Sequence, residues 1–334
     1  NDTGRVREVT NTDQPGAKLT AAARRRNCQR PLAAGERMRE DKTIYALGFF
    51  DGVHLGHQAL LAACKDLAAE TGAKTGVVTF SAHPDTLVLG KTPPFINSPQ
   101  DRKLLLQQLG GVEQVVTLPF DREMMNMPWQ DFFQMLLTDY GAAGLVCGED
   151  FTFGRRGEGN AALLREAAAK ARIPCRVVRQ RTYAGVVISS THIRSLLVAG
   201  EMEKAVEFLG HPHVLTGQVI SGQQLGRTLG IPTANLALPQ GVICPRFGVY
   251  ACKAKVQGQW YPAVTNVGCR PTVGGKTVTV EPWLLGFEGD IYGETLCLEF
   301  YKFLRPEKKF SSLEALQEEI LKNARQTREF FGKK

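Results

Sequence analysis

The sequence lacks several features that would place it in a specialised class of protein. Its 334 residues contain no run of about 18 consecutive apolar residues, the length needed to cross a bilayer. The N-terminus has no short basic region followed by an apolar core, as a signal peptide would. The eight cysteines form no CxxC pair, which disfavours a structural zinc site and favours reduced, buried thiols over disulfides. With 43% hydrophobic and 22% charged residues, we expect a soluble, cytoplasmic protein.

Length and charge narrow the classes further. The length suggests two domains, because domains average about 150 residues. The formal net charge is +8, and residues 1–37 alone carry eight basic and four acidic side chains. The rest of the charge is spread thinly, without the basic stripe of a nucleic-acid-binding surface. We therefore expect small anionic ligands, with no nucleic-acid partner and no membrane partner.

Residues 1–37 differ from the rest of the chain. They lack hydrophobic periodicity, contain Arg24-Arg25-Arg26 and do not begin with methionine. Such a segment cannot bury enough apolar surface to offset its ordering entropy. We expect either that Met38 is the natural start or that residues 1–37 form a disordered basic extension.

In the next part of the chain, apolar runs alternate with helical stretches. The runs typical of buried strands are Thr43–Phe49, Gly76–Phe80, Gln114–Leu118, Ala143–Cys147 and Arg176–Val178. The helical stretches are His57–Glu70, Ser98–Leu109, Pro128–Leu137 and Asn160–Ala171. The alternation predicts an α/β domain over residues 38–206, with a parallel sheet covered on both faces and ligands beyond the carboxyl ends of the strands.

After about His211 the pattern changes to short strands separated by Gly- and Pro-rich turns. The strand-like segments are Val214–Ser221, Val249–Val256, Trp260–Val267, Lys276–Leu285 and Thr295–Phe303. Strands without intervening helices predict an antiparallel β-barrel. An amphipathic helix over about Ser311–Phe331 closes the chain. We place the boundary near Glu207–His213 and the second domain at residues 212–334.

The strongest local signal is a glycine turn between a strand and a helix, Gly48-Phe-Phe-Asp-Gly-Val-His-Leu-Gly-His57. A helix N-terminus presents unpaired N–H groups and a partial positive charge, which suit phosphate. Gly52 and Gly56 let the backbone approach a ligand, and His54 and His57 can donate hydrogen bonds to phosphate oxygens. The alternative is a structural role for each histidine, but two of only six histidines share this turn. A metal site is disfavoured because no third ligand is near.

A second glycine-rich segment spans Gly217–Asn235. Its four glycines, Gly217, Gly222, Gly226 and Gly230, flank Arg227. Glycines let a loop wrap around phosphates, although ordinary turns contain the same residues and this segment lacks the Walker sequence GKS or GKT. Thr233 and Asn235 alternate, so both side chains face one side of an extended segment. Their oxygens suit Mg²⁺, which binds through few protein ligands and substrate phosphates.

These motifs resemble those of the prokaryotic bifunctional riboflavin kinase/FAD synthetase family. The glycine turn is similar to the nucleotidyltransferase HxGH motif in its GxFDGVHxGH form. Three further segments resemble TFxPHP, GxDFxFG and ISSTxIR, namely Thr79–Pro84, Gly148–Gly154 and Ile188–Arg194. The second glycine-rich segment resembles the riboflavin kinase signature GxxxGRxLGxPTAN and is followed in family order by Gly248–Tyr250, Asn266–Thr272 and Tyr292–Gly293.

The resemblance covers nearly everything from Met38 to the C-terminus and implies both fold and reactions. It implies a Rossmann-like HxGH nucleotidyltransferase domain, then a mostly antiparallel riboflavin kinase barrel with a C-terminal helix. The barrel domain would phosphorylate riboflavin to FMN with ATP. The first domain would transfer AMP from a second ATP to FMN, giving FAD and pyrophosphate. Mg²⁺ with ATP is the implied cofactor, and flavins are substrate and product.

In the adenylyltransferase site, the resemblance implies that the glycine turn and the ISSTxIR segment hold the ATP phosphates. The residues are Gly48, Phe50, Asp51, Gly52, His54, Gly56, His57, Ser189, Ser190, Thr191 and Arg194. Among them, His54, His57 and Arg194 are the expected catalytic residues. A flavin or nucleotide pocket is expected at His83, Asp150, Phe151 and Phe153. The alternatives are a helix N-cap at Ser189 with Arg194 solvated, core packing for the two phenylalanines, and packing for His83.

In the kinase site, the resemblance implies phosphate binding by Gly222, Gly226, Arg227, Gly230, Thr233 and Asn235, the last two also holding Mg²⁺. Glu281 is the expected base for the ribityl hydroxyl, and an exposed strand carboxylate is the alternative. Arg305 either contacts the flavin phosphate or anchors the last helix. The chain departs from the family at Phe49, which is commonly Asn, at Ser81-Ala82, and at Trp283 and Gly286, where His and Asp are frequent.

Two other functions remain open at this point. One is an adenylyltransferase that acts on another small substrate, and the other is a flavin-binding regulator or nucleic-acid binder. Neither accounts for both phosphate-binding segments together with Glu281. Turnover of riboflavin with ATP and Mg²⁺ separates these alternatives.

Overall fold

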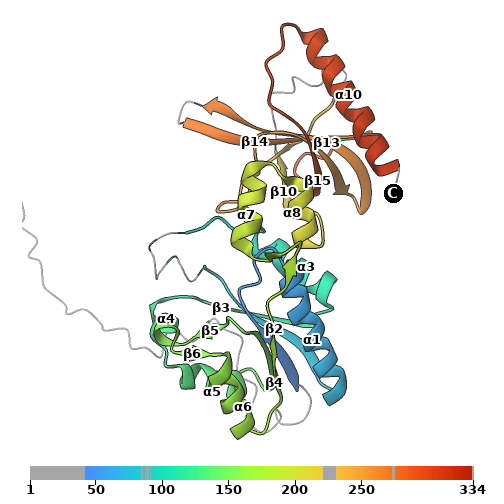
Figure 1. Ribbon diagram of the computed structural model, residues 1–334. Helices are drawn as coiled ribbons and strands as arrows, with labels where there is room; N and C mark the ends of the chain where they lie inside the picture. Colours follow the sequence, from blue (N-terminus) through green and yellow to red (C-terminus); the bar gives the residue numbers. More distant parts are fainter. Residues whose placement is uncertain are drawn as a thin grey trace, which may run out of the picture. The chain divides into compact units, whose positions relative to one another are not determined.

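The computed structural model describes residues 42–83, 86, 90, 92–220, 231–272 and 275–332, and Figure 1 shows its helices and strands. The expected extension at residues 1–37, the start at Met38 and the four residues Gly222, Gly226, Arg227 and Gly230 lie outside these residues. Within the described part, no helix is both long and apolar enough to span a membrane. The seven cysteines of this part are free thiols, as expected.

A five-stranded parallel sheet forms the centre of the N-terminal domain, which confirms the α/β prediction. In sheet order its strands are β3 (Gln114–Leu118), β2 (Lys74–Phe80), β1 (Thr43–Leu47), β4 (Ala142–Gly148) and β7 (Cys175–Val178). The chain lays down β1, β2 and β3 toward one edge and then places β4 on the other side of β1. Such a reversal opens a crevice at the carboxyl ends of the strands, where ligands bind in sheets of this type.

Helices cover both faces of the sheet because alternate residues of each strand point to opposite sides. Ile44 and Ala46 of β1 pack in one core cluster, whereas Tyr45 and Leu47 pack in another. The first cluster includes residues of α1 (Leu55–Thr71) and α3 (Pro99–Gly110), and the second includes residues of α5 (Trp129–Thr138) and α6 (Ala161–Lys170). Figure 1 shows α1 and α6 on either side of the strands.

Several short elements complete this domain, and one of them, the helix capped by Ser189, was an alternative that the sequence left open. They are α4 (Arg122–Asn126), the pairs β5 (Thr152–Phe153) with β6 (Gly159–Asn160) and β8 (Thr182–Tyr183) with β9 (Val186–Val187), the 3₁₀ turn η2 (Arg155–Gly157), α7 (Ser190–Ala199) and α8 (Met202–Leu209). Helix α7 begins at Ser190 because the Ser189 side chain accepts a hydrogen bond from the His192 N–H at 3.2 Å.

A closed six-stranded antiparallel barrel follows, as predicted. In barrel order its strands are β10 (His213–Ile220), β11 (Asn235–Leu236), β14 (Gly275–Leu284), β13 (Gln259–Thr272), β12 (Gly248–Val256) and β15 (Thr295–Pro306). Helix α10 (Leu313–Gly332) packs against the outside of β12 and β13, where Ala324 joins Val249 and Val264 in a small apolar cluster. The domain ends expected at residues 206 and 212 stay predictions.

Candidate active sites

A strained turn joins β1 to α1 at the opening of the crevice. Three of its residues have positive φ angles, Phe50 at 59°, Gly52 at 84° and Val53 at 41°. Non-glycine residues are strained in this region, and such strain clusters at functional sites. A side chain at Gly52 would place its Cβ 2.9 Å from Ile96 Cδ1, so glycine is required here for two independent reasons.

The two histidines of the turn stack on each other. Their ring centroids lie 3.6 Å apart at an interplanar angle of 13°, and His54 Nδ1 accepts the backbone N–H of His57 at 3.3 Å. Burial lowers the pKa of His54 to about 4, and burial together with the neighbouring His54 and Arg102 lowers the pKa of His57 well below its usual value. Both rings are therefore neutral at pH 7, and each has one N–H to donate. Within the described residues, His57 Nδ1 is buried without a hydrogen-bond partner.

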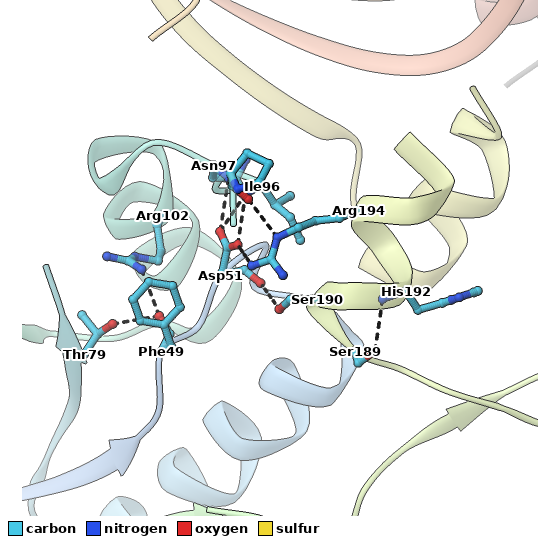
Figure 2. Close-up of polar contacts among 11 residues, drawn as sticks. Phe49, Asp51, Thr79, Ile96, Asn97, Arg102, Ser189, Ser190, His192 and Arg194 are labelled. Atoms are coloured by element: carbon cyan, nitrogen blue, oxygen red, sulfur yellow. Dashed lines mark hydrogen bonds and ion pairs between the residues drawn. The ribbon is translucent and has the colours of Figure 1, made fainter. Parts of the chain in front are cut away.

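Asp51 is the centre of the polar contacts that hold the turn, as Figure 2 shows. Its carboxylate, only 1% exposed, accepts the Ile96 N–H at 2.9 Å and pairs with Arg194 Nη2 at 2.7 Å. Ser190 Oγ donates to the Asp51 carbonyl at 2.8 Å, and Arg194 Nε donates to the Pro94 carbonyl at 2.8 Å. Asp51 and Arg194, both expected at the phosphates, thus connect α7 to the glycine turn.

One cavity of about 380 Å³ lies at the carboxyl ends of β1 and β4. It brings together eight of the expected site residues, Gly48, His54, Gly56, His57, Asp150, Phe151, Ser189 and Ser190. The other expected residues of this domain lie outside its lining: Phe50, Asp51, Gly52, His83, Phe153, Thr191 and Arg194. Segments more than 100 residues apart in sequence, such as His57 and Ser189, therefore meet at the crevice predicted for this sheet.

The GxDFxFG-like segment forms the opposite wall of this cavity. Asp150 accepts a hydrogen bond from Gln180 Nε2 at 3.0 Å, and a Cβ at Gly148 would lie 2.7 Å from Asp150 Oδ1. Phe151 lines the cavity, whereas Phe153 is 6% exposed and belongs to the core cluster behind it. The two rings stack with centroids 5.5 Å apart. The phenylalanines thus take different positions, one at the cavity and one in the core.

A second cavity, of about 360 Å³, opens between the barrel and α10. Thr233, Glu281 and Arg305 line it together. The Ala234 N–H donates to the Pro282 carbonyl at 2.9 Å, which holds the segment of Thr233 beside the strand of Glu281. Thr233 also lines a neighbouring cavity of about 180 Å³. One hydroxyl therefore borders two adjacent cavities.

Arg305 and Asn235 differ in their surroundings. Arg305 Nε donates to Asn323 Oδ1 of α10 at 3.0 Å and lies 3.7 Å from the Glu319 carboxylate, so the helix-anchoring contact is present at the cavity wall. Asn235 opens β11 opposite Ile220 of β10 and does not line either cavity.

Two family models match the chain, FAD synthetase over residues 36–192 and riboflavin kinase over residues 209–331. The bifunctional riboflavin kinase/FMN adenylyltransferase of Listeria monocytogenes is 35% identical over 87% of this chain and 93% of its own length. Its counterpart in Escherichia coli K12 is 33% identical over 88% of this chain and 94% of its own length. The chain belongs to the bifunctional riboflavin kinase/FMN adenylyltransferase family.

The FAD synthetase domain is N-terminal and the riboflavin kinase domain is C-terminal, which confirms the family, the order of the domains and the two activities expected from the motifs. A solved structure described as a macrolide-efflux protein from Streptococcus pneumoniae is also similar, with a TM-score of 0.79 and 30% identity. It matches 86% of this chain and 94% of that chain. Its fold therefore extends across both domains, although neither family match describes efflux.

Two of the departures from the family pattern, Phe49 and Trp283, lie at the two cavities, whereas Ser81, Ala82 and Gly286 line neither. Phe49 lines the FAD synthetase cavity and packs edge-on against His83, with ring centroids 4.8 Å apart. Trp283 lines the riboflavin kinase cavity, two residues after Glu281. Both positions therefore present an aromatic ring to a cavity of the enzyme.

Two contacts at the FAD synthetase site had no signal in the sequence. Arg102 of α3 donates to the carbonyls of Phe49 and Phe80, at 3.1 and 2.9 Å. His211, which belongs to the riboflavin kinase match, places Nε2 2.8 Å from the Gly52 carbonyl. Neither residue belongs to a motif, and their roles follow only from the fold.

Proposed function

We propose that the FAD synthetase cavity binds the triphosphate of ATP at the start of α1 and takes FMN as the acceptor of AMP. The first N–H groups of a helix have no intrahelical partner and attract anions. Neutral His54 and His57 add N–H donors at the same end of the helix. The observation that carries the proposal is the convergence of the HxGH turn, Asp150 and Ser189–Ser190 on one cavity.

The chain's contribution to adenylyl transfer is positioning and charge stabilisation. Phosphoryl transfer needs little covalent chemistry from a protein, and preorganised donors stabilise the negative charge that develops on departing pyrophosphate. In this proposal His54, His57 and the Ser189 hydroxyl hold the phosphates, whereas the Ser190 hydroxyl donates to the Asp51 carbonyl and holds the glycine turn. Arg194 acts through its ion pair with Asp51, which orients α7 against the glycine turn.

We propose that Glu281 is the base of the kinase and accepts the proton of the ribityl hydroxyl of riboflavin. Its carboxylate and the Thr233 hydroxyl line the same cavity, and Thr233 also reaches the adjoining cavity, where ATP would lie. The Thr233 hydroxyl fits Mg²⁺, a hard ion that takes oxygen ligands, whereas Asn235 lines neither cavity and its role as a second ligand stays a prediction. When bound, Mg²⁺ would neutralise charge on the ATP phosphates.

The test is product analysis by chromatography after the purified protein is incubated with riboflavin, ATP and MgCl₂. The wild-type protein should form FMN and then FAD. Omission of MgCl₂ with a chelator present should suppress both products. Absence of both products from the wild-type protein would contradict the proposed function, and formation of FMN alone would contradict the adenylyltransferase half. The cytoplasmic location and the absence of a nucleic-acid partner stay predictions.

Variants separate the two sites. His57→Ala should abolish FAD formation and leave FMN formation unchanged. Glu281→Gln should lower FMN formation by about 10²-fold or more, because a positioned base contributes about 10²–10⁴-fold, and should leave FAD formation from supplied FMN intact. Glu329→Gln, at an exposed carboxylate of α10, is the matched control. Equal loss of both activities in either active-site variant would contradict independent sites.

A further inference from the structure

Arg102 is a buried cation directly behind the FAD synthetase cavity. It projects from α3, is 3% exposed, and donates Nη1 to the Phe49 carbonyl at 3.1 Å and Nη2 to the Phe80 carbonyl at 2.9 Å. Its guanidinium lies 4.6 Å from the centroid of the Phe49 ring, and Figure 2 shows it beside Phe49 and Thr79. Phe49 and Phe80 follow β1 and end β2, so Arg102 holds the ends of two neighbouring strands together.

The charge of Arg102 has no negative partner in contact. Within the part of the chain that the structure describes, Arg102 forms no ion pair, and both of its hydrogen bonds go to neutral carbonyls. Burial lowers the pKa of Arg102 and the nearby carboxylate of Asp51 raises it, but the contact of that carboxylate is with Arg194, at 2.7 Å. Since Asp51 and Arg194 neutralise each other, one positive charge remains. A buried charge without a counter-charge is unfavourable, so its presence calls for an explanation.

The position of Arg102 relates this charge to the cavity. Both carbonyls that it holds belong to residues that line the cavity, Phe49 and Phe80. The guanidinium also acts electrostatically on His57, whose pKa it helps to lower. The positive charge of Arg102 repels a proton on His57. For the same reason it attracts an anion that lies beside the His57 ring.

We propose that Arg102 is a positioning residue whose buried charge is balanced by the phosphates of the substrate, so that the site discriminates a nucleoside polyphosphate from the nucleoside. This inference rests on the proposed binding of ATP in the cavity. A guanidinium that served only to hold the strand ends would require its donors but not its charge. The two roles are separable, because lysine retains the charge with one donor group and glutamine retains a donor without the charge.

The experiment compares the KM of ATP and the inhibition constant of adenosine for FAD formation from supplied FMN, which report on the FAD synthetase site and not on the kinase site, in the full-length wild type, Arg102→Lys and Arg102→Gln. Adenosine, which has no phosphates, is the matched ligand. Arg102→Gln should weaken the binding of ATP about tenfold or more and change that of adenosine by about twofold or less, because a charge in a low-dielectric interior attracts an anion without contact and has no such effect on a neutral ligand. Arg102→Lys should bind ATP within about threefold of wild type.

Two results would overturn the inference. One is that Arg102→Lys and Arg102→Gln weaken the binding of ATP equally. The other is that Arg102→Gln weakens the binding of ATP and that of adenosine equally. Thr79→Val supplies a second test that does not depend on the folding of an Arg102 variant. Thr79 Oγ1 donates to the same Phe49 carbonyl at 2.8 Å, so valine loosens the strand end without a change in charge. Thr79→Val should bind ATP within about threefold of wild type, and a larger loss would overturn the inference.

The same measurements separate this inference from the function on which it rests. If the wild type bound adenosine and ATP equally, or neither, the proposed function would fail and the inference would fall with it. If the wild type bound ATP and made FAD but the lysine and glutamine variants were alike, only the role of the charge would fail. Riboflavin phosphorylation should be the same in all variants, because Arg102 lies in the other domain.

Discussion

Replacement of His213 by phenylalanine should stabilise the protein, and more so at acidic pH. His213 begins β10, is 0% exposed, and packs against Phe300 with ring centroids 5.7 Å apart and the rings tilted by 42°. Within the described residues, neither of its ring nitrogens has a hydrogen-bond partner. Phenylalanine has a ring of similar size and no polar atoms, so His213→Phe removes two unsatisfied groups from the core. Unsatisfied buried polar groups cost about 1–3 kcal/mol each.

The dependence on pH follows from the pKa of His213. Burial, with a smaller contribution from His211, lowers this pKa from 6.5 to about 3. The unfolded chain therefore binds more protons than the folded chain between these two values, and stability decreases as pH falls through this window. From the two pKa values, His213 costs about 0.2 kcal/mol of stability at pH 7 and about 2 kcal/mol at pH 5. Phenylalanine does not titrate, so the variant avoids this loss.

The assay is urea unfolding of both proteins at pH 7 and pH 5, followed by tryptophan fluorescence. Trp260 and Trp283 of the barrel report on the domain that contains His213. The variant should be more stable at pH 7 by about 2–6 kcal/mol for the two groups together, and its advantage should increase by about 2 kcal/mol at pH 5. Other buried histidines are present in both proteins and cancel in the difference. An advantage that does not change with pH, or a less stable variant, would refute this reasoning.

Three further changes test the contacts around the glycine turn. Asp51→Asn leaves the Arg194 guanidinium without its partner and should lower the free energy of unfolding by about 3–5 kcal/mol. Urea unfolding measures this loss, and a loss below about 1 kcal/mol would contradict a buried ion pair. Gly52→Ala places an alanine at a positive φ and brings its Cβ close to Ile96. It should lower the free energy of unfolding by about 1–2 kcal/mol and should also reduce FAD formation. Unchanged values in melting and turnover assays would argue against the strained turn. His211→Leu removes the contact with the Gly52 carbonyl and should lower the kcat of FAD formation but not of FMN formation, whereas His211→Gln should recover most of it; equal rates in the two variants would exclude this contact as the cause.

The order of the elements was predictable because local patterns encode it. The apolar run Gln114–Leu118 is β3 as expected, and the other strands of the sheet agree within a few residues. The same holds for the long barrel strands and for α10. In contrast, β11 is only two residues long and exists because Leu236 pairs with Val219 and Val280. A pairing of this kind leaves no hydrophobic period in the sequence.

The site was predictable to the extent that its residues form contiguous motifs. His54 and His57 share one turn, and their place at the start of a helix follows from the glycines and the preceding strand. Asp51 and Arg194 belong to two different motifs, and neither motif predicts that they pair. They meet across 143 positions of sequence, and their ion pair supports the turn, whereas their expected contact with phosphates stays a prediction.

The residues alone were thus sufficient for the order of the two domains, the family and the short motifs proposed to contact nucleotides, because each depends on neighbours along the chain. The fold in space was needed to show which side chains reach a cavity and which stand behind it. It showed that Phe151 lines the cavity whereas Phe153 lies in the core. It also placed Arg102, which belongs to no motif, behind the cavity in which the phosphates are proposed to bind. The physical reason is that burial and unpaired charge depend on packing between distant segments.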